Sequence, residues 1–124
     1  MLARVGLISF PNIVSVINLG VIKIMASINA KLDDAINRGN LEEVKELLRQ
    51  GADIEYQDPF GSTPLMNAAW IASTELVDYL ISKGANVNHL DKEGESALSR
   101  VKSIGHNEFG HNDVIDLLVS KGAK

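Results

Sequence analysis

The sequence predicts an all-α solenoid, in which short helix-turn-helix units stack on one another. The first indication is an internal repeat, because GADI at 51–54 returns as GANV at 84–87. Leu32, Leu65 and Leu98 keep the same spacing. Each period also holds two runs with apolar residues at helical spacing, separated by a short break. A period of about 33 residues is typical of stacked repeats. The chain should therefore form three units, at about 25–57, 58–90 and 91–124.

Residues 1–24 precede this pattern and differ from it. No charged residue lies between Arg4 and Lys23, and most of the residues there are Val, Ile, Leu or Phe. Three interpretations remain open. The segment is a signal peptide or membrane anchor, or it results from a translation start assigned upstream of the true one at Met25, or it is an extra helix or strand that folds over the array. The repeat domain is expected to span 25–124.

The second unit shows the expected order of elements most clearly. Thr63 is placed to cap a helix with its hydroxyl, and Pro64 suits the first helical position, where no amide partner is needed. A break at Ala72 and Ser73 precedes a second helix, expected over roughly 74–82. The apolar residues predicted to face the core of this unit are Leu65, Ala68, Ala69, Leu76, Val77, Leu80 and Ile81.

The first and third units repeat this order. The first unit breaks at Gly39 and Asn40, and the third should begin its first helix after a cap at Ser96. The core residues predicted for these units are Leu32, Ala35, Ile36, Val44, Leu47 and Leu48 in the first, and Leu98, Val101, Ile115, Leu118 and Val119 in the third.

The stretch DPFGSTPLMNAAWIASTELVDYLISKGANVNHLD, residues 58–91, resembles an ankyrin repeat of the form D-x-x-G-x-T-P-L-H-x-A-A. The resemblance covers about 25–124 and is weaker in the first and third units. It implies an ankyrin-repeat solenoid whose units are joined by β-turn fingers. Ankyrin repeats usually have a histidine after T-P-L, which hydrogen-bonds between neighbouring repeats. Here Met66 takes that place.

By the same resemblance, a partner protein would contact the fingers and the ends of the first helices, which form a concave surface. Phe60, Trp70 and Ile71 are large apolar residues at such positions and resemble a recognition centre. Trp70 has a second interpretation, in which it packs beneath an inserted loop or beneath residues 1–24. The full set of candidate partner-binding residues is Tyr56, Phe60, Ser62, Trp70, Ile71, His89, Glu93 and Glu95.

The stretch GHNEFGHND at 105–113 lengthens the third unit. Counting forward from the leucines and back from the closing glycines shows that the unit is five residues too long, with the excess between the two GHN copies. An insertion in the loop between two helices explains this extra length. A metal site is the weaker alternative, and its ligands would be His106, Glu108, His111 and Asp113.

Composition and charge exclude several classes of function. All sixteen acidic residues follow Met25, together with ten of the twelve basic ones, so this part carries a net charge of −6 and should not bind nucleic acid. The sequence has no cysteine, no phosphate-binding glycine loop and no nucleophile elbow. We therefore expect a monomeric, cytoplasmic protein that is not an enzyme, has no cofactor and binds a partner protein, as an adaptor, inhibitor or immunity-type module.

Two other functions are kept as alternatives. The protein would be a membrane-attached or exported accessory scaffold if residues 1–24 form an anchor. We expect contact with a membrane only through this segment. A metal-dependent enzyme built on the loop at 105–113 is a distant third.

Overall fold

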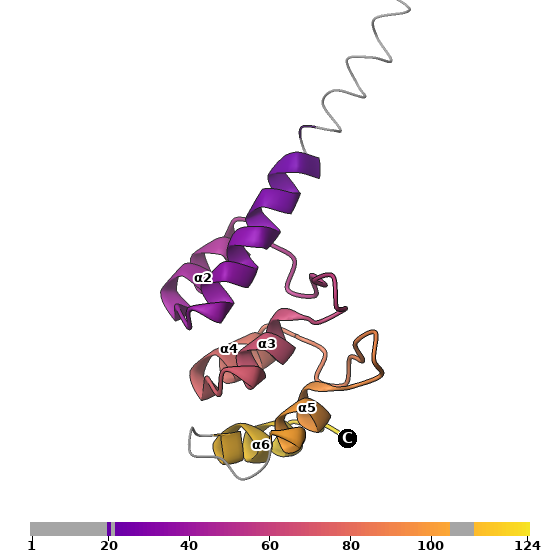
Figure 1. Cartoon of the computed structure of the whole chain (residues 1–124). Coiled ribbons are helices and arrows are strands. Elements are labelled where there is room, and N and C mark those ends of the chain that lie inside the picture. Colours follow the sequence, from indigo (N-terminus) through magenta and orange to yellow (C-terminus); the bar gives the residue numbers. More distant parts are fainter. Residues whose placement is uncertain (1–19, 21, 105–110) are drawn as a thin grey trace, which may run out of the picture.

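The structure, a computed structural model, describes residues 20, 22–104 and 111–124 (Figure 1). All regular secondary structure in these residues is helical, so the predicted all-α class is confirmed. The elements are a first helix over 22–37, then α2 (Leu41–Arg49), α3 (Pro64–Trp70), α4 (Thr74–Ser82), α5 (Ala97–Ser103) and α6 (His111–Ser120).

The helices stack as three pairs, one pair for each unit (Figure 1). In the second unit α3 packs on α4, and both helices contact the third unit, because α3 touches α5 and α6 and α4 touches α6. The loops that lead from one pair to the next project from one side of the stack. This is the solenoid of helix-turn-helix units that the internal repeat of the sequence predicts.

The first helix begins before the expected start of the repeat domain. Residues 22–24 are already helical and continue into the first unit without a break at Met25. Residues 1–19 lie outside the described residues, and so do their interpretations as an anchor, a signal or a misplaced start. No helix in the described part of the chain is long and apolar enough to cross a membrane. The domain boundary at residue 25 stays a prediction.

The helix starts follow the capping signals in the sequence. Thr63 caps α3, where its hydroxyl accepts a hydrogen bond from the backbone N–H of Met66 at 3.4 Å, and Pro64 is the first helical residue. Ser96 caps α5, and the hydroxyl of Ser99 accepts from the Ser96 N–H in return, so the two residues form a capping box. The predicted caps at Thr63 and Ser96 are confirmed.

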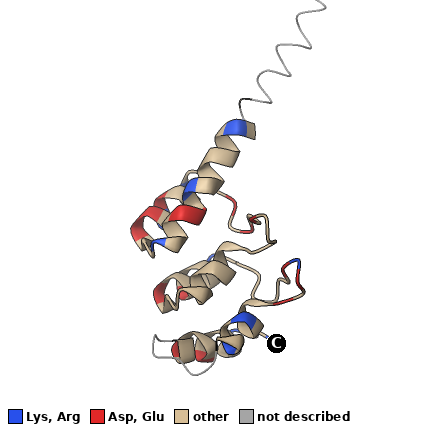
Figure 2. Ribbon diagram, viewed as in Figure 1, with Lys and Arg blue, Asp and Glu red and all other residues tan. Residues whose placement is uncertain are grey.

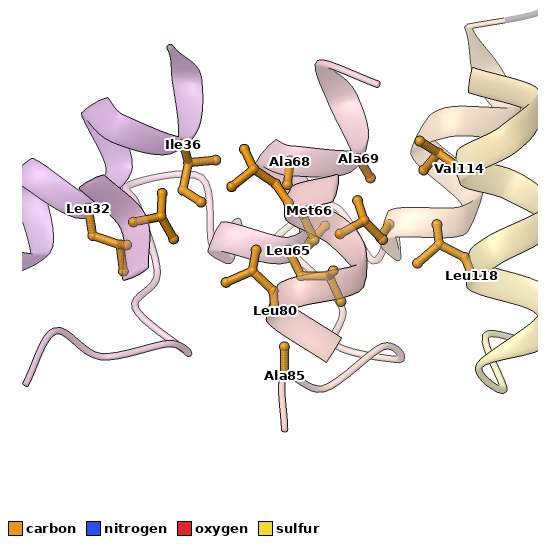
Figure 3. Packing of buried hydrophobic residues seen from close by; sticks show 14 of the residues in the cluster. Leu32, Ile36, Leu65, Met66, Ala68, Ala69, Leu80, Ala85, Val114 and Leu118 are labelled. Carbon is orange, nitrogen blue, oxygen red and sulfur yellow. The ribbon is translucent and has the colours of Figure 1, made fainter. Parts of the chain in front are cut away.

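One apolar core runs through all three units (Figure 3). Leu32 and Ile36 come from the first unit, Leu65 and Leu80 from the second and Leu118 from the third, and each is at most 1% exposed. Burying a side chain of this size stabilises the fold by about 1.5–3 kcal/mol. Each unit covers the apolar face of its neighbour, which is how an array of short helix pairs becomes stable.

Val119 and Met66 differ from what the repeat spacing and the family pattern lead us to expect. The spacing predicts that Val119 faces the core, and this is wrong, because its side chain is 53% exposed. The equivalent residue of the second unit, Ile81, packs against the core and has the third unit beside it, whereas the structure describes no unit beyond α6. Met66, in the place of the family's histidine, is 1% exposed and extends the core with an apolar side chain.

The break between α3 and α4 contains a residue in an unfavourable backbone conformation. Ala72 has a φ of 62°, in the left-handed region, and the equivalent residue between the first two helices is Gly39, with a φ of 69°. Ala72 N–H donates to Ala69 O and Gly39 N–H to Ile36 O, so the two turns have the same geometry. An L-residue with a side chain is disfavoured there by about 1–2 kcal/mol.

We therefore expect Ala72→Gly to raise the free energy of unfolding by about 1 kcal/mol, after allowance for the greater freedom of glycine in the unfolded chain. Urea denaturation of the full chain measures it. The matched control is Gly39→Ala, which should lower stability by a similar amount, since a Cβ there would meet nothing closer than Ile71 Cδ1 at 3.8 Å. A loss of stability in Ala72→Gly would contradict this explanation of the turn.

Candidate protein-binding surface

Two finger turns present backbone and side chains at one edge of the stack, the middle finger over 58–62 and the last finger over 91–95. Each begins with an aspartate that organises the turn. In the middle finger, Asp58 Oδ1 accepts hydrogen bonds from the N–H groups of Phe60 and Ser62, both at 2.9 Å. The Asp58 N–H also donates to Ser62 O at 3.0 Å. These bonds close the turn and hold Phe60 at its tip.

The last finger repeats this turn and adds an ion pair. Asp91 Oδ1 accepts from the N–H groups of Glu93 at 2.8 Å and Glu95 at 2.9 Å. Its Oδ2 accepts from Arg100 of α5, from Nη2 at 2.6 Å and from Nε at 2.9 Å. The Asp91 side chain is fully buried and that of Arg100 is 18% exposed. The ion pair therefore joins the finger to the helix that follows it.

The pKa of Asp91 reflects this environment. Burial alone would raise it, because a buried carboxylate is poorly solvated. The backbone N–H of Glu95, the Arg100 guanidinium and the backbone N–H of Glu93 stabilise the charged form more strongly, so the pKa lies below its ordinary value.

Contacts between the two fingers fix their relative position. The Lys92 N–H donates to Phe60 O at 3.1 Å. His89 approaches Gly61 O with Nε2 at 3.1 Å, and because a carbonyl can only accept, Nε2 must carry the proton. His89, a candidate partner-binding residue, thus has a structural contact of its own.

Gly61 lies where the fingers are closest, and its substitution should measure that contact. Gly61 and Gly94 are equivalent and have φ of 79° and 77°, so a side chain is strained at both. An added Cβ at Gly61 would lie 2.9 Å from Lys92 N, whereas at Gly94 it would meet nothing within 4 Å. We expect Gly94→Ala to destabilise the fold by about 1 kcal/mol and Gly61→Ala by at least about 2 kcal/mol, measured by urea denaturation. Equal losses of stability in the two variants would mean that the contact between the fingers contributes nothing to the stability of the fold.

A hollow of about 470 Å³ lies between the fingers and the first helices of the second and third units. Each unit contributes its finger and its first helix, so the hollow spans the junction between units. The lining residues are Asp58, Phe60, Ser62, Asn67 and Trp70 from the second unit and Glu93, Glu95, Arg100 and Ser103 from the third. Five of the eight candidate residues from the sequence therefore border one hollow.

The two aromatic candidates in this lining are both exposed. Phe60 on the middle finger is 69% exposed, and Trp70 at the end of α3 is 53% exposed. Glu93 is exposed and Glu95 half-buried on the last finger. Ser62 differs from its expected role, because it is only 2% exposed and belongs to the floor of the hollow. Its backbone N–H is bound to Asp58, which turns the residue inward.

Ile71 and Tyr56 lie away from the lining of the hollow. Ile71 is half-buried and packs against the core, and its Cδ1 is directed toward Gly39 of the first unit. It therefore belongs to the junction of the first two units, although it follows Trp70 directly in the sequence. Tyr56 is half-buried in the loop that leads to the middle finger.

His111 plays a part that its sequence pattern does not indicate. The structure places it in the first turn of α6, 6% exposed, instead of in a loop. Its Nε2 donates to the backbone carbonyl of Trp70 at 2.9 Å, and within the described residues its Nδ1 has no hydrogen-bond partner. The third unit thus holds the end of α3 in place. The bond between His111 and Trp70 joins two units, which the apolar side chain of Met66 cannot do by hydrogen bonding.

The hydrogen bond between His111 and Trp70 removes one ligand from the alternative metal site. His111 has its Nε2 committed to a carbonyl, and His106 and Glu108 lie outside the described residues. Asp113 is exposed in the first turn of α6. No group of three or more potential metal ligands is found among residues 20, 22–104 and 111–124. The predicted insertion, at 105–109, also lies outside the described residues.

Negative charge continues from the hollow to the first unit. Asp33 Oδ1 accepts from Asn67 Nδ2 at 3.0 Å, across the junction of the first two units. The pKa of Asp33 lies above its ordinary value, mainly because burial disfavours its charge. The Asn67 hydrogen bond opposes this shift, and the nearby carboxylates of Asp58 and Asp34 add to it. Asp33, Asp34 and Asp58 thus place acidic side chains near one another at the junction of the first two units.

Comparison with known proteins agrees with this architecture. The sequence profile described as ankyrin repeats, in three copies, matches residues 32–124. The ankyrin repeat, SAM and basic leucine zipper domain-containing protein 1 of Mus musculus is 35% identical over 95 residues, which are 77% of this chain and 20% of the relative. Its counterpart in Eulemur macaco macaco is 36% identical over 89 residues, or 72% of this chain and 18% of the relative. The chain spans about a fifth of the length of these curated relatives.

Proposed function

Because this chain belongs to the ankyrin-repeat family, we propose that it is a protein-binding module that holds a partner protein against the hollow between its two fingers. Ankyrin repeats are in general protein–protein interaction modules, and stacked repeats bind through such extended surfaces. The observation that carries the proposal for this site is the exposure of Phe60 and Trp70, at 69% and 53%, around one hollow. Exposed aromatic residues of this kind supply most of the free energy of many interfaces.

The two aromatic residues are also held in position before a partner arrives. The Phe60 carbonyl accepts from Lys92 N–H, and the Trp70 carbonyl accepts from His111 Nε2. Both backbones are thus tied to the third unit. A surface that is already ordered loses less conformational entropy on binding, which leaves more of the contact energy as affinity.

The role that fits such a surface is steric. By covering part of a partner, the module would act as an adaptor, an inhibitor or an immunity-type protein, and would need no catalytic group. Glu93 and Glu95 on the last finger are proposed to contact the partner together with the two aromatic residues. Tyr56, Ile71 and His89 lie outside the lining of the hollow, and Ser62 supports the contact area from the floor.

Capture of a partner from a lysate of the native host, with wild type and variants as bait, tests the proposal. Trp70→Ala and Phe60→Ala should each weaken partner binding about thirtyfold, the effect of losing a hot-spot aromatic. Each should lower the Tm by less than about 4 °C, because neither side chain is in the core. Val119→Ala is the matched control, since it also removes an exposed apolar side chain and should bind as wild type does.

If Trp70→Ala and Phe60→Ala retain the partner as wild type does, the interface lies elsewhere on the molecule. If Trp70→Ala instead lowers the free energy of unfolding by roughly 3 kcal/mol, as truncation of a buried tryptophan does, then Trp70 is a packing residue.

A further inference from the structure

We propose that the hollow receives a positively charged side chain, a lysine or an arginine, from a basic segment of the partner protein. This inference rests on the proposed function and specifies the chemistry of the partner. It is carried by the combination of two exposed aromatic rings and several unpaired carboxylates around one hollow.

The aromatic part of the lining suits a cation. Phe60 and Trp70 border the same hollow from two elements, the middle finger and the end of α3. A cation within about 6 Å of an aromatic ring face is attracted to it, and tryptophan gives the strongest attraction. Elsewhere in this chain Tyr79 has such partners, with Lys45 Nζ at 5.4 Å and Lys83 Nζ at 5.7 Å from its ring centroid. Within the described residues, Phe60 and Trp70 have none.

The charged part of the lining is negative and unpaired. Asp58, Glu93 and Glu95 line the hollow, and none of them forms an ion pair within residues 20, 22–104 and 111–124. Among the described residues Arg100 is the one basic residue in the lining, and Asp91 holds its guanidinium through two hydrogen bonds. The exposed Lys92 lies on the last finger but is not part of the lining. The hollow therefore has carboxylates whose counter-charge must come from outside.

The surroundings strengthen this preference. Asp33 of the first unit lies close enough to Asp58 for their charges to interact, and this adds to the effect of burial in raising the pKa of Asp33. Figure 2 shows acidic residues along the loops that project from the stack, with a basic residue on the last of these loops, and both acidic and basic residues on the helices of the first unit. A cationic side chain that approaches the hollow would be attracted to its carboxylates, with an effect that salt screens.

An uncharged partner side chain fits the hollow less well. It could pack against Phe60 and Trp70, but it would cover the carboxylates of Glu93 and Glu95 without giving them a partner. Removing a charged group from water without such compensation is strongly unfavourable. The same argument disfavours nucleic acids and anionic lipid surfaces, whose phosphates carry the same charge as the hollow.

Trp70 is the single tryptophan of the chain, so its indole N–H gives one assignable signal for the hollow. The experiment titrates the ¹⁵N-labelled full chain with four peptides, acetyl-Ala-X-Ala-amide, in which X is arginine, lysine, citrulline or norleucine. Citrulline keeps the shape of arginine without the charge, and norleucine keeps the aliphatic chain of lysine without its amino group. We expect saturable shifts of the indole signal with arginine, lysine or both, and about tenfold weaker binding of the matched uncharged peptide.

Two double variants separate the hollow from general charge effects. Glu93→Gln with Glu95→Gln should abolish the preference for the charged peptides, as should a severalfold increase in the NaCl concentration. Glu75→Gln with Asp78→Asn removes the same charge from exposed positions on α4 and should leave the preference unchanged. The inference is overturned if no charged peptide gives a saturable shift, if the uncharged peptides bind equally well, or if the two double variants behave alike.

These outcomes are distinct from those of the lysate experiment. A partner that Trp70→Ala loses, combined with no preference for charged peptides, would leave the proposed function standing and reject the cation. A clear preference for charged peptides, combined with full retention of the partner by Trp70→Ala, would support the cation site and reject the proposed interface.

Discussion

Asp91→Ala is expected to lower the free energy of unfolding by about 3–4 kcal/mol, as measured by urea denaturation at pH 7. The substitution removes the acceptor of two backbone hydrogen bonds in the last finger and leaves Arg100, which is 18% exposed, without its partner. The matched control is Asp34→Ala, because Asp34 also pairs with an arginine, Arg38, but both side chains are about half or more exposed. An exposed pair contributes about 0–1 kcal/mol, so the control should change little.

Asp91→Asn separates the charge from the hydrogen bonds of the turn. Asparagine can still accept from Glu93 and Glu95, so the loss should be smaller than for alanine. Since the pKa of Asp91 is lowered by folding, its charge stabilises the protein above the unfolded pKa of about 4, and this contribution disappears as the pH falls through the lower folded value. The difference between wild type and Asp91→Asn should therefore shrink in acid. A difference that stays constant from pH 7 to pH 2 would contradict the ion pair.

Leu65→Ala should have the second large effect, a loss of about 3 kcal/mol, because Leu65 is 1% exposed in the middle of the core and the substitution leaves a cavity there (Figure 3). A loss of this size is a large part of the total stability of a typical small domain. Val119→Ala is the control, with an expected change within about 0.5 kcal/mol. Similar losses for the two variants would show that the core does not extend through the middle unit as described.

The fold was predictable from the sequence because its signals are local and repeated. The return of GADI as GANV marks the period, and the caps at Thr63 and Ser96 each act within a few residues and match the structure. The exception, Val119, shows the limit of such reasoning. A repeat pattern predicts the same face for Ile81 and Val119, but burial depends on which neighbouring units are present.

The candidate site was predictable in part. The family pattern places Phe60 and Trp70 where the structure has two exposed aromatic residues. It also proposes Ile71, which the structure turns toward Gly39, because adjacent residues at a helix end point in different directions. Ser62 was proposed from its position alone, and the turn that Asp58 organises buries it.

Two functional contacts gave no clear signal in the sequence. The pair of Asp91 and Arg100 has the same spacing as Asp58 and Asn67, but Asn67 bonds to Asp33 instead, so the spacing alone did not predict the ion pair. The bond from His111 to Trp70 joins residues far apart in the chain, at the start of α6 in the third unit and at the end of α3 in the second. The direction of such a contact depends on how the units stack, which short-range patterns do not describe.

Acrylamide quenching of the Trp70 fluorescence, measured with and without the partner captured from the native host, tests the central claim most directly. Trp70 is the only tryptophan of this chain, and at 53% exposure it should be readily quenched in the free protein. The partner's tryptophans, if it has any, are removed from the measurement by labelling Trp70 as 5-fluorotryptophan and following its ¹⁹F signal for solvent exposure. If the partner binds against the hollow, Trp70 becomes strongly protected in the complex. If the partner is bound and Trp70 remains as exposed as in the free protein, the hollow is not the binding surface.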